Sequence, residues 1–225
     1  MCTLYTIGLS PAVGAEMPRP RIVDVDKIVG AALDIADEEG LSAVSMRTVS
    51  ERLGVVPMAL YRHIDNKEDL LNRMADSVLS MLPEMARDLD WRAGLVELFV
   101  ALRDLMVQHH GMAELMLQRT TGAPTMLRAA ETALLAMEAD GVSAHQAVTT
   151  LAMLQWSTLG AALHGTARAA REANELPPAI ASIDAATYPA ISRAESEFSE
   201  GSRRDQFRDG LEGLLNSVGA CVRPA

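Results

Sequence analysis

The chain has 225 residues, of which 49% are hydrophobic and only 4% are aromatic. This length and composition allow a real hydrophobic core, divided between one small module and one larger domain. The formal net charge of −10 excludes a protein that holds nucleic acid through its overall charge. Alanine, leucine, methionine, glutamate and arginine dominate the long periodic stretches, so the composition favours an all-α fold.

Residues 1–20 are expected to form a flexible N-terminal arm, because they contain the turn-forming residues Pro11, Gly14, Pro18 and Pro20. A leader without function, or a wrongly assigned start codon, is the alternative. The two cysteines, Cys2 and Cys221, have no metal-type spacing and no secretory signal before them, which indicates a cytoplasmic protein. No apolar run reaches the roughly 20 residues that cross a bilayer, so no membrane contact is expected.

The first predicted helix covers residues 26–40, DKIVGAALDIADEEG. Its apolar residues Ile28, Ala32, Ile35 and Ala36 recur with the spacing of one helix face. A glycine at the end of the segment can terminate the helix. This helix is expected to open a module of three to four helices that extends to about residue 82.

Residues 45–66, SMRTVSERLGVVPMALYRHIDN, predict a helix-turn-helix. Ser45 can cap the first of two short helices, and Gly54 can take the left-handed conformation that ends it. Pro57 then lies in the first turn of the second helix, where its missing amide proton costs nothing, and Leu60 can anchor that helix in the core. Because such a motif places its second helix in a DNA groove, the first hypothesis is recognition of duplex DNA.

A further helix is predicted over residues 67–82, KEDLLNRMADSVLSML. Asn66 can cap it, and its apolar residues lie on one face at helical spacing. This helix is expected to pack behind the helix-turn-helix and stabilise it.

The order of these features resembles the DNA-binding domain of the TetR family of bacterial regulators. The resemblance covers Val25 to Leu82 and rests on ALDIADEEGLSAVSMRTVSERLGV followed by ALYRHIDNKEDLL. From Trp91 to about Val222 the chain resembles the family's effector and dimerisation domain, most like the tetracycline-repressor type, through DWRAGLVELFVALRDLMVQHH, MLQWSTLGAAL and RDGLEGLL. The implied division is an arm at 1–20, a DNA-binding domain at 21–82 with its helix-turn-helix at 45–64, and an effector and dimerisation domain at 83–225.

Base reading is expected from the start of the second helix of the motif, which offers Pro57, Met58 and Ala59 to the major groove. These three side chains can touch thymine methyl groups but cannot form paired hydrogen bonds with a base. Arg47 of the preceding helix is the best candidate for a hydrogen bond to a base, to guanine, with a solvated surface arginine as the alternative. Thr48, on the solvent side of the same helix, is a further candidate DNA contact.

Phosphate contacts are implied by the resemblance at Tyr61, His63 and Lys67. The alternative for Tyr61 is a buried ring that holds the module together. Residues 45–67 contain four basic and two acidic residues, whereas the chain from residue 83 onward contains 12 basic and 18 acidic ones. The acidic charge therefore lies mostly away from the expected DNA contact, and binding should weaken steeply with added salt.

The second domain is expected, by the resemblance, to bind a small molecule between its helices. Candidate lining residues lie on apolar helix faces, each with plain core packing as its alternative: Leu98, Leu102, Met106, His109, Met116, Met126, Met153 and Trp156. Tetracycline repressors hold a magnesium-chelated drug with a histidine where this chain has Met116, and carry another polar ring where it has Trp156. The lining therefore favours an apolar or aromatic effector over magnesium-tetracycline, and no cofactor is expected.

Dimerisation is expected at the last two helices, predicted at Ala144–Arg171 and Arg203–Ala220 and joined by a long connection from about Asn174 to Ser202. In relatives of this type two such helices from each subunit form a four-helix interface. The apolar positions that suit this role are Leu211, Leu214, Leu215 and Val218, with intrachain core as the alternative.

An enzyme or a metalloprotein is not indicated. His110 and Glu114 are four residues apart, but two possible ligands do not make a closed zinc site. The sequence instead predicts a homodimeric repressor that binds a palindromic operator and is released by a small-molecule inducer; an activator would carry the same features. A protein-interaction module that retains the helix-turn-helix as a relic is the other alternative, and the joint presence of Arg47, Tyr61, His63 and Lys67 argues against it.

Overall fold

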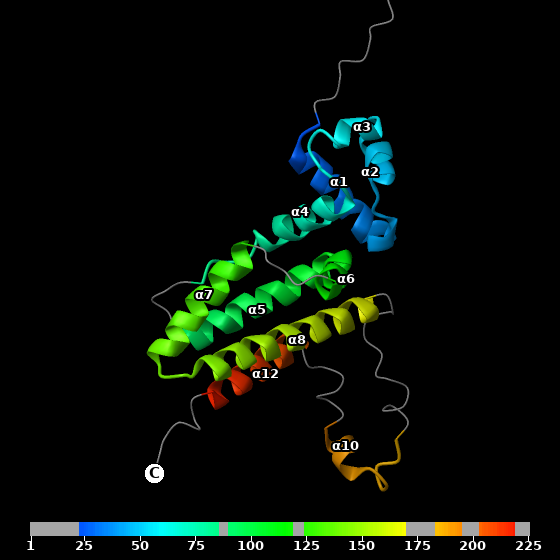
Figure 1. The fold of residues 1–225 in the computed structure, drawn as a ribbon. Coiled ribbons are helices and arrows are strands. Elements are labelled where there is room, and N and C mark those ends of the chain that lie inside the picture. The colour runs from blue at the N-terminus through cyan, green and yellow to red at the C-terminus, as the bar shows by residue number, and fades with distance from the viewer. Residues whose placement is uncertain (1–22, 86–89, 119–123, 170–182, 195–202, 219–225) are drawn as a thin grey trace, which may run out of the picture.

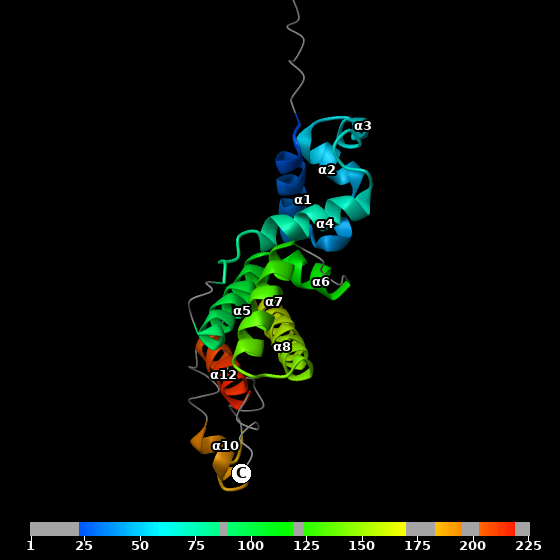
Figure 2. The same cartoon turned by 60° about the vertical axis from the view of Figure 1, so that its left-hand side comes forward.

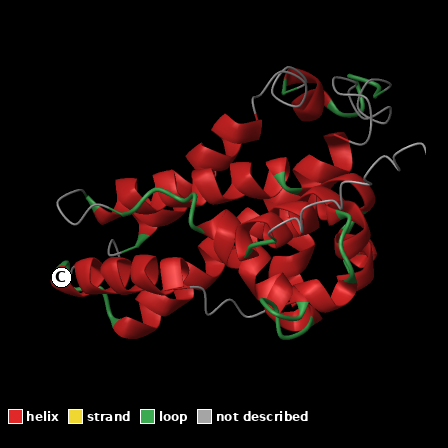
Figure 3. Cartoon of the chain, turned by 90° about the horizontal axis from the view of Figure 1, so that it is seen from above, coloured by secondary structure: helices red, strands yellow, loops and turns green. Residues whose placement is uncertain are grey.

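The computed structural model describes residues 23–85, 90–118, 124–169, 183–194 and 203–218. The regular elements among these residues are all helices, which confirms the predicted all-α fold (Figure 3). The N-terminal module contains α1 (Val25–Glu39), the 3-10 turn η1 (Leu41–Ala43), α2 (Met46–Leu53), α3 (Pro57–Leu60) and α4 (Lys67–Leu79). It is followed by α5 (Trp91–Gln108), α6 (His110–Gln118), α7 (Pro124–Ala139), α8 (Ala144–Ala169), α10 (Pro189–Arg193) and α12 (Arg203–Ser217).

The boundaries of α2, α3 and α4 are set by capping residues. Ser45 and Thr48 form a reciprocal capping box at the start of α2, with each side chain accepting the other residue's backbone N–H. Gly54 ends α2 in the left-handed conformation, at φ 68°. Pro57 is the first residue of α3, and Asn66 accepts a backbone N–H at the start of α4. The predicted caps and the glycine turn are thus confirmed.

Ion pairs as well as packing connect the end of α1 to α2. Gly40 terminates α1 at φ 89°, as predicted, and the short η1 that follows was not predicted. Arg52 of α2 binds the carboxylates of Glu38 and Glu39 at 2.8 and 3.2 Å. Beneath these contacts the module has one continuous core, whose largest fully buried side chains are Ile28, Ile35, Leu60, Ile64, Leu70, Met74 and Leu79.

The C-terminal helices form a bundle below the N-terminal module, with α4 leading from one to the other (Figures 1 and 2). α5 is the central helix of this bundle and packs against α7, α8 and α12. It can do so because it is apolar on most of its surface. Its buried side chains include Leu95, Leu98, Phe99, Leu102 and Met106.

The start of α5 is fixed to the turn between α7 and α8 by one carboxylate. Asp140 accepts hydrogen bonds from Trp91 Nε1 at 2.7 Å and from Arg92 Nη1 at 3.2 Å. The Arg92 guanidinium also lies over the Trp91 ring, 4.0 Å from its centroid. The hydrogen bond from Trp91, followed by that from Arg92, lowers the pKa of Asp140 below its usual value of 3.8.

Asp140→Asn should therefore reduce stability at neutral pH by an amount that disappears in acid. A carboxylate whose pKa is lowered by folding contributes stability above its unfolded pKa and loses it as the pH falls through the folded value. Urea unfolding of both proteins between pH 3 and pH 7 measures the difference in the free energy of unfolding. Trp91→Phe, which removes the main donor, should show the same trend, and a difference that stays constant down to pH 3 would contradict this role.

α6 joins the two parts of the molecule, since it packs against α1, η1 and α4 as well as against α5 and α8. His109 Nδ1, at the start of α6, lies 2.8 Å from Asp37 Oδ2 of α1. Two residues after His109, Gly111 is buried against Ala36: a Cβ on Gly111 would lie only 2.9 Å from the Ala36 Cβ. The N-terminal module therefore rests on α6 through a tight contact between small residues and one polar bridge.

Gly111→Ala is expected to lower the free energy of unfolding by about 1–3 kcal/mol, because neither clashing atom belongs to a flexible side chain. Ala36→Gly in the same protein should recover most of this loss, apart from its own helix-propensity cost of about 1 kcal/mol. Gly30→Ala in α1, where a Cβ meets nothing within 4 Å, is the matched control and should not destabilise. Thermal unfolding of the single and double variants tests this, and simple additivity in the double variant would contradict the clash.

The connection between α8 and α12 contains a short helix, α10, that was not predicted. It lies apart from the bundle in both side views (Figures 1 and 2). The rest of the predicted connection and the predicted arm at residues 1–20 lie outside the described residues. Among the described helices, none is long and apolar enough to span a membrane.

Candidate DNA-binding surface and effector cavity

The outer surface of the helix-turn-helix is formed by α3 and the turn after it. Leu60 and Ile64 are fully buried and anchor this segment in the core. Around these anchors Met58 is 70% exposed and Tyr61 is 48% exposed, so the Tyr61 ring is not a buried staple. Pro57, Arg62, His63 and Lys67 are also exposed, and Ala59 is half-buried. We define these seven residues, 57–59, 61–63 and 67, as the reading surface.

The two polar candidates for DNA contact on α2, Arg47 and Thr48, differ in the contacts that their side chains make within the protein. Arg47 is highly exposed, and its Nε lies 3.3 Å from Glu51 Oε1 in a surface ion pair. Such a pair contributes little to stability and is easily exchanged for another partner. The Thr48 hydroxyl, in contrast, accepts the Ser45 N–H at 2.9 Å and lies 2.8 Å from the Ala43 carbonyl oxygen. Thr48 thus has a structural task in the α2 cap, whereas the Arg47 guanidinium faces solvent.

The phosphate candidates lie at the junction between α3 and α4. Tyr61 and His63 belong to the turn after α3, and Lys67 is the first residue of α4, where Asn66 caps the helix. These three exposed residues therefore present one hydroxyl, one imidazole and one ammonium group next to α3. These groups can all donate hydrogen bonds to phosphate oxygens.

An apolar cavity of about 150 Å³ lies between α5, α7 and α8. Two of the predicted ligand contacts, Leu98 and Met126, line it. The sequence did not single out the remaining lining residues, which are Leu95, Phe99, Leu127, Ala129, Ala130, Leu151 and Gln155. We call this space the inner cavity; Gln155 is its one polar side chain.

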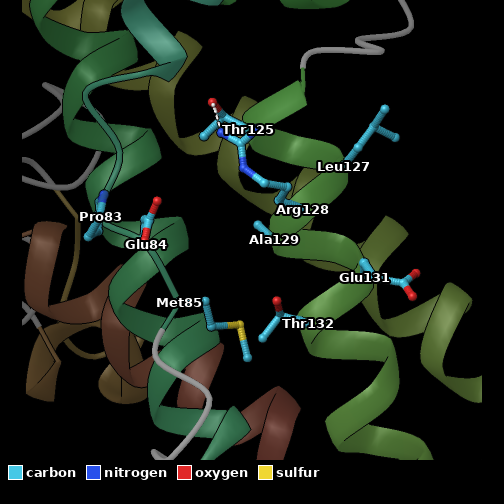
Figure 4. A pocket seen from close by; sticks show the side chains of 9 residues that line it. All are labelled: Pro83, Glu84, Met85, Thr125, Leu127, Arg128, Ala129, Glu131 and Thr132. Carbon is cyan, nitrogen blue, oxygen red and sulfur yellow. Dashed lines mark hydrogen bonds between the residues drawn. The ribbon is translucent and has the colours of Figure 1, made fainter.

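A second, more polar cavity of about 540 Å³ opens between the α4–α5 connection and α7 (Figure 4). Pro83, Glu84 and Met85 line one side of it, and Arg128 on the other side extends toward Thr125, with Nη2 3.3 Å from Oγ1. The other residues that line this outer cavity come from α7. Leu127 and Ala129 line both spaces, so the outer cavity adjoins the inner one.

The other predicted ligand contacts lie elsewhere. Leu102, Met106 and Met116 are buried core residues that line neither of these cavities. His109 lies at the junction with α1, where it meets Asp37. Met153 and Trp156 point outward from α8, at 43% and 66% exposure. Helical periodicity could identify all of these as apolar positions, but it could not say which face of a helix lines a cavity.

The predicted dimer contacts on α12 are divided between the core and the surface. Leu211 and Leu215 are 2% and 0% exposed, which places them in the chain's own core, the alternative that the sequence left open. Leu214 and Val218 are half-buried. The exposed positions of α12 include small and polar residues at helical spacing, Gln206, Gly210, Gly213 and Ser217, next to the acidic residues Asp205, Asp209 and Glu212.

α8, one of the two helices predicted to form the dimer, carries an exposed stripe whose residues were not predicted as a surface. Its members recur at intervals of three or four residues on one side of the helix, and they include the largest exposed side chain of α8. A Cβ at Gly160 would meet nothing within 4 Å, so this side of α8 is open. We call this set the α8 stripe: Thr149, Met153, Trp156, Gly160 and His164.

In the part of the chain that the structure describes, no group of three or more histidine, cysteine, aspartate or glutamate side chains is placed to hold a metal ion.

Comparison with known proteins assigns both parts of the chain to one family. Residues 28–74 match the family of bacterial regulatory proteins named tetR, and residues 82–221 match the tetracycline repressor-like C-terminal domain. The class A tetracycline repressor of transposon 1721 from Escherichia coli is 30% identical, over 85% of this chain and 88% of its own length. The transcriptional repressor DrrR1 of Streptomyces coeruleorubidus is 28% identical, over 97% of this chain and 84% of its own.

Solved structures give the same result. The ActR protein of Streptomyces coelicolor in complex with actinorhodin is 26% identical, with a TM-score of 0.73, over 89% of this chain and 99% of that chain. The regulator SCO7222 of the same organism is also 26% identical, with a TM-score of 0.75, over 90% and 100% of the two chains. The chain therefore belongs to the TetR family of DNA-binding transcriptional regulators and is not an enzyme.

Proposed function

We propose that this protein is a homodimeric, ligand-responsive repressor that binds a palindromic operator and is released by an apolar or aromatic inducer. The observation that carries the proposal is the reading surface, where exposed apolar, hydroxyl and cationic side chains surround a capped helix-turn-helix. In this proposal residues 21–82 bind DNA, and residues 83–225 bind the effector and form the dimer. Arg47 and the start of α3 contact bases, and Tyr61, His63 and Lys67 contact phosphates.

The proposed dimer surface combines the α8 stripe with the exposed face of α12. Trp156 and Met153 provide apolar area, and an exposed tryptophan of this kind is typical of an interface anchor. Gly210 and Gly213 of α12 leave open space where a side chain of another helix could enter. In a two-fold symmetric dimer the α8 stripe of each subunit would meet the helices of its partner. The two reading surfaces would then lie roughly 34 to 36 Å apart, one turn of DNA.

The proposed effector site is the inner cavity together with the adjoining outer cavity. An apolar space of about 150 Å³ suits one benzene-sized ring. A larger aromatic effector would extend past Leu127 and Ala129 into the outer cavity, where Arg128 and Thr125 can bind polar substituents. The complex of the relative ActR with actinorhodin supports an organic effector of this kind. Magnesium-tetracycline stays disfavoured in this proposal, because the chain has Met116 where tetracycline repressors are expected to carry the histidine that holds the chelated drug.

Coupling between the two domains would pass through α6. This helix touches α5 and α8 of the bundle and α1 of the DNA-binding module, and the Asp37–His109 bridge spans the junction. An effector that favours another position of α6 would change the spacing of the two reading surfaces. Because such coupling is reciprocal, the operator must weaken effector binding by the same factor.

Selection of bound sites from randomised duplex DNA tests the proposal, followed by a salt titration of the best site against a scrambled one. A palindromic site, bound by two chains with a steep salt dependence, is the expected result. Sedimentation of the free protein and of the complex gives the stoichiometry. Failure to enrich any sequence, with equal affinity for the scrambled duplex, would reject operator recognition and favour the protein-interaction alternative.

A further inference from the structure

We propose that Met58, assisted by Val56, reads the methyl groups of thymines, so that each operator half-site has at least one thymine whose methyl group is required for tight binding. This inference rests on the proposed function and adds what the reading surface and the adjoining Val56 recognise. It depends on which side chains at the start of α3 are exposed and can therefore contact a base.

The two apolar side chains at this point are largely exposed in the folded chain. Met58 is 70% exposed and Val56 is 67% exposed, the highest exposed fractions among the large hydrophobic residues of the described chain. Val56 is the N-cap of α3, and its side chain forms no capping hydrogen bond. Exposure of two large apolar side chains at the leading end of a reading helix is unfavourable in water unless another surface covers them.

Two hydroxyl side chains on the neighbouring helix, α2, already form hydrogen bonds within the protein. The Thr48 hydroxyl is held by Ser45 and Ala43 in the α2 cap. The Ser50 hydroxyl is buried and donates to the Arg47 carbonyl oxygen at 2.7 Å. This leaves the exposed Arg47 guanidinium as the hydrogen-bonding reader on α2, and Val56 and Met58 as the readers at the start of α3.

The major groove presents one apolar group to such side chains, the C5-methyl group of thymine. A methionine thioether is flexible and polarizable, so it can cover a methyl group at more than one position in the groove. Tyr61, Arg62, His63 and Lys67, which lie a few residues further along the chain, offer hydrogen-bond donors to the flanking phosphates, and Arg62 and Lys67 add positive charge. The DNA group that fits Val56 and Met58 is therefore the methyl-bearing edge of a thymine, flanked on both sides by contacts to the DNA backbone.

Deoxyuridine tests this directly, because it lacks only the methyl group and pairs with adenine in the same way. Each thymine of the selected operator is replaced in turn, symmetrically in both half-sites, and the affinity of the full chain is measured by fluorescence anisotropy. We expect at least one replacement to weaken binding about fourfold per half-site, the effect of one lost methyl contact. In the Met58→Ala protein the same replacement should change affinity less than twofold.

Two further variants are measured against the same uracil replacements as controls. Val56→Ala measures the contribution of Val56 to the uracil effect separately from that of Met58. Met81→Ala removes another exposed methionine, 59% exposed and beyond the far end of α4, and should leave the uracil effect unchanged. The proposal is overturned by an operator that tolerates uracil at every thymine, or by a uracil effect that is equal in wild type, Met58→Ala and Val56→Ala. Failure to enrich any operator would instead reject the proposed function, and this inference with it.

Discussion

Trp156→Glu should convert the protein into a monomer and abolish tight operator binding. Trp156 is 66% exposed on α8 although it is a large aromatic side chain. In a two-fold dimer it would be buried twice, and anchors of this type contribute about 2 kcal/mol or more each. The dimer dissociation constant should therefore rise by about a thousandfold or more. Sedimentation equilibrium and operator titration measure the two effects.

Leu135→Glu is the matched control for this variant. Leu135 is an exposed leucine of α7, at 55%, and does not belong to the α8 stripe, so its replacement should leave the dimer intact. Tryptophan fluorescence adds an independent reading, since the only other tryptophan, Trp91, is 3% exposed and should report little change. Dilution of the wild-type protein should shift the emission of Trp156 to the red as the dimer dissociates. A dimeric Trp156→Glu protein with unchanged operator affinity would reject the α8 stripe as the interface.

The N-terminal module could be predicted closely because its structure depends on local signals. The Ser45 cap, the left-handed Gly54 and the Asn66 cap each depend on a residue type at a fixed position next to a helix end. Thr48 has one role in this module that was not predicted. It was predicted as a DNA contact, but nothing in the periodicity shows that its hydroxyl completes the Ser45 capping box.

The C-terminal domain was less predictable, since its sites depend on which helix faces meet. Leu98 and Trp156 both occupy apolar positions at helical spacing, but one lines the inner cavity and the other is exposed on α8. On helices as apolar as α5 and α8, a period of 3.6 residues marks two or three faces as possible core. His109 illustrates the same problem: its partner Asp37 is 72 residues away, so no local pattern could pair them.

Arg47→Ala should weaken binding to the selected operator by about 5-fold to 150-fold per half-site and relax the preference at one base pair, a guanine contact. Its guanidinium is exposed on α2, and its ion pair with Glu51 is easily exchanged for a base edge. Lys67→Ala should instead weaken all sequences about equally and lower the salt dependence by about one charge per subunit. Titrations against the operator, single-base variants and a scrambled duplex, each at several salt concentrations, separate the two patterns.

Glu51→Gln distinguishes base reading from a structural effect of the ion pair. If Arg47 acted only by pairing with Glu51, this substitution would reproduce the loss seen in Arg47→Ala. If Arg47 reads a base, Glu51→Gln should preserve sequence preference and strengthen binding to all duplexes slightly, because one negative charge near DNA is removed. An equal loss of affinity on every sequence for Arg47→Ala would assign Arg47 to the phosphates. The hydrogen-bonding part of specificity would then be missing from α2, and readout would depend on Val56, Met58 and the shape of the groove.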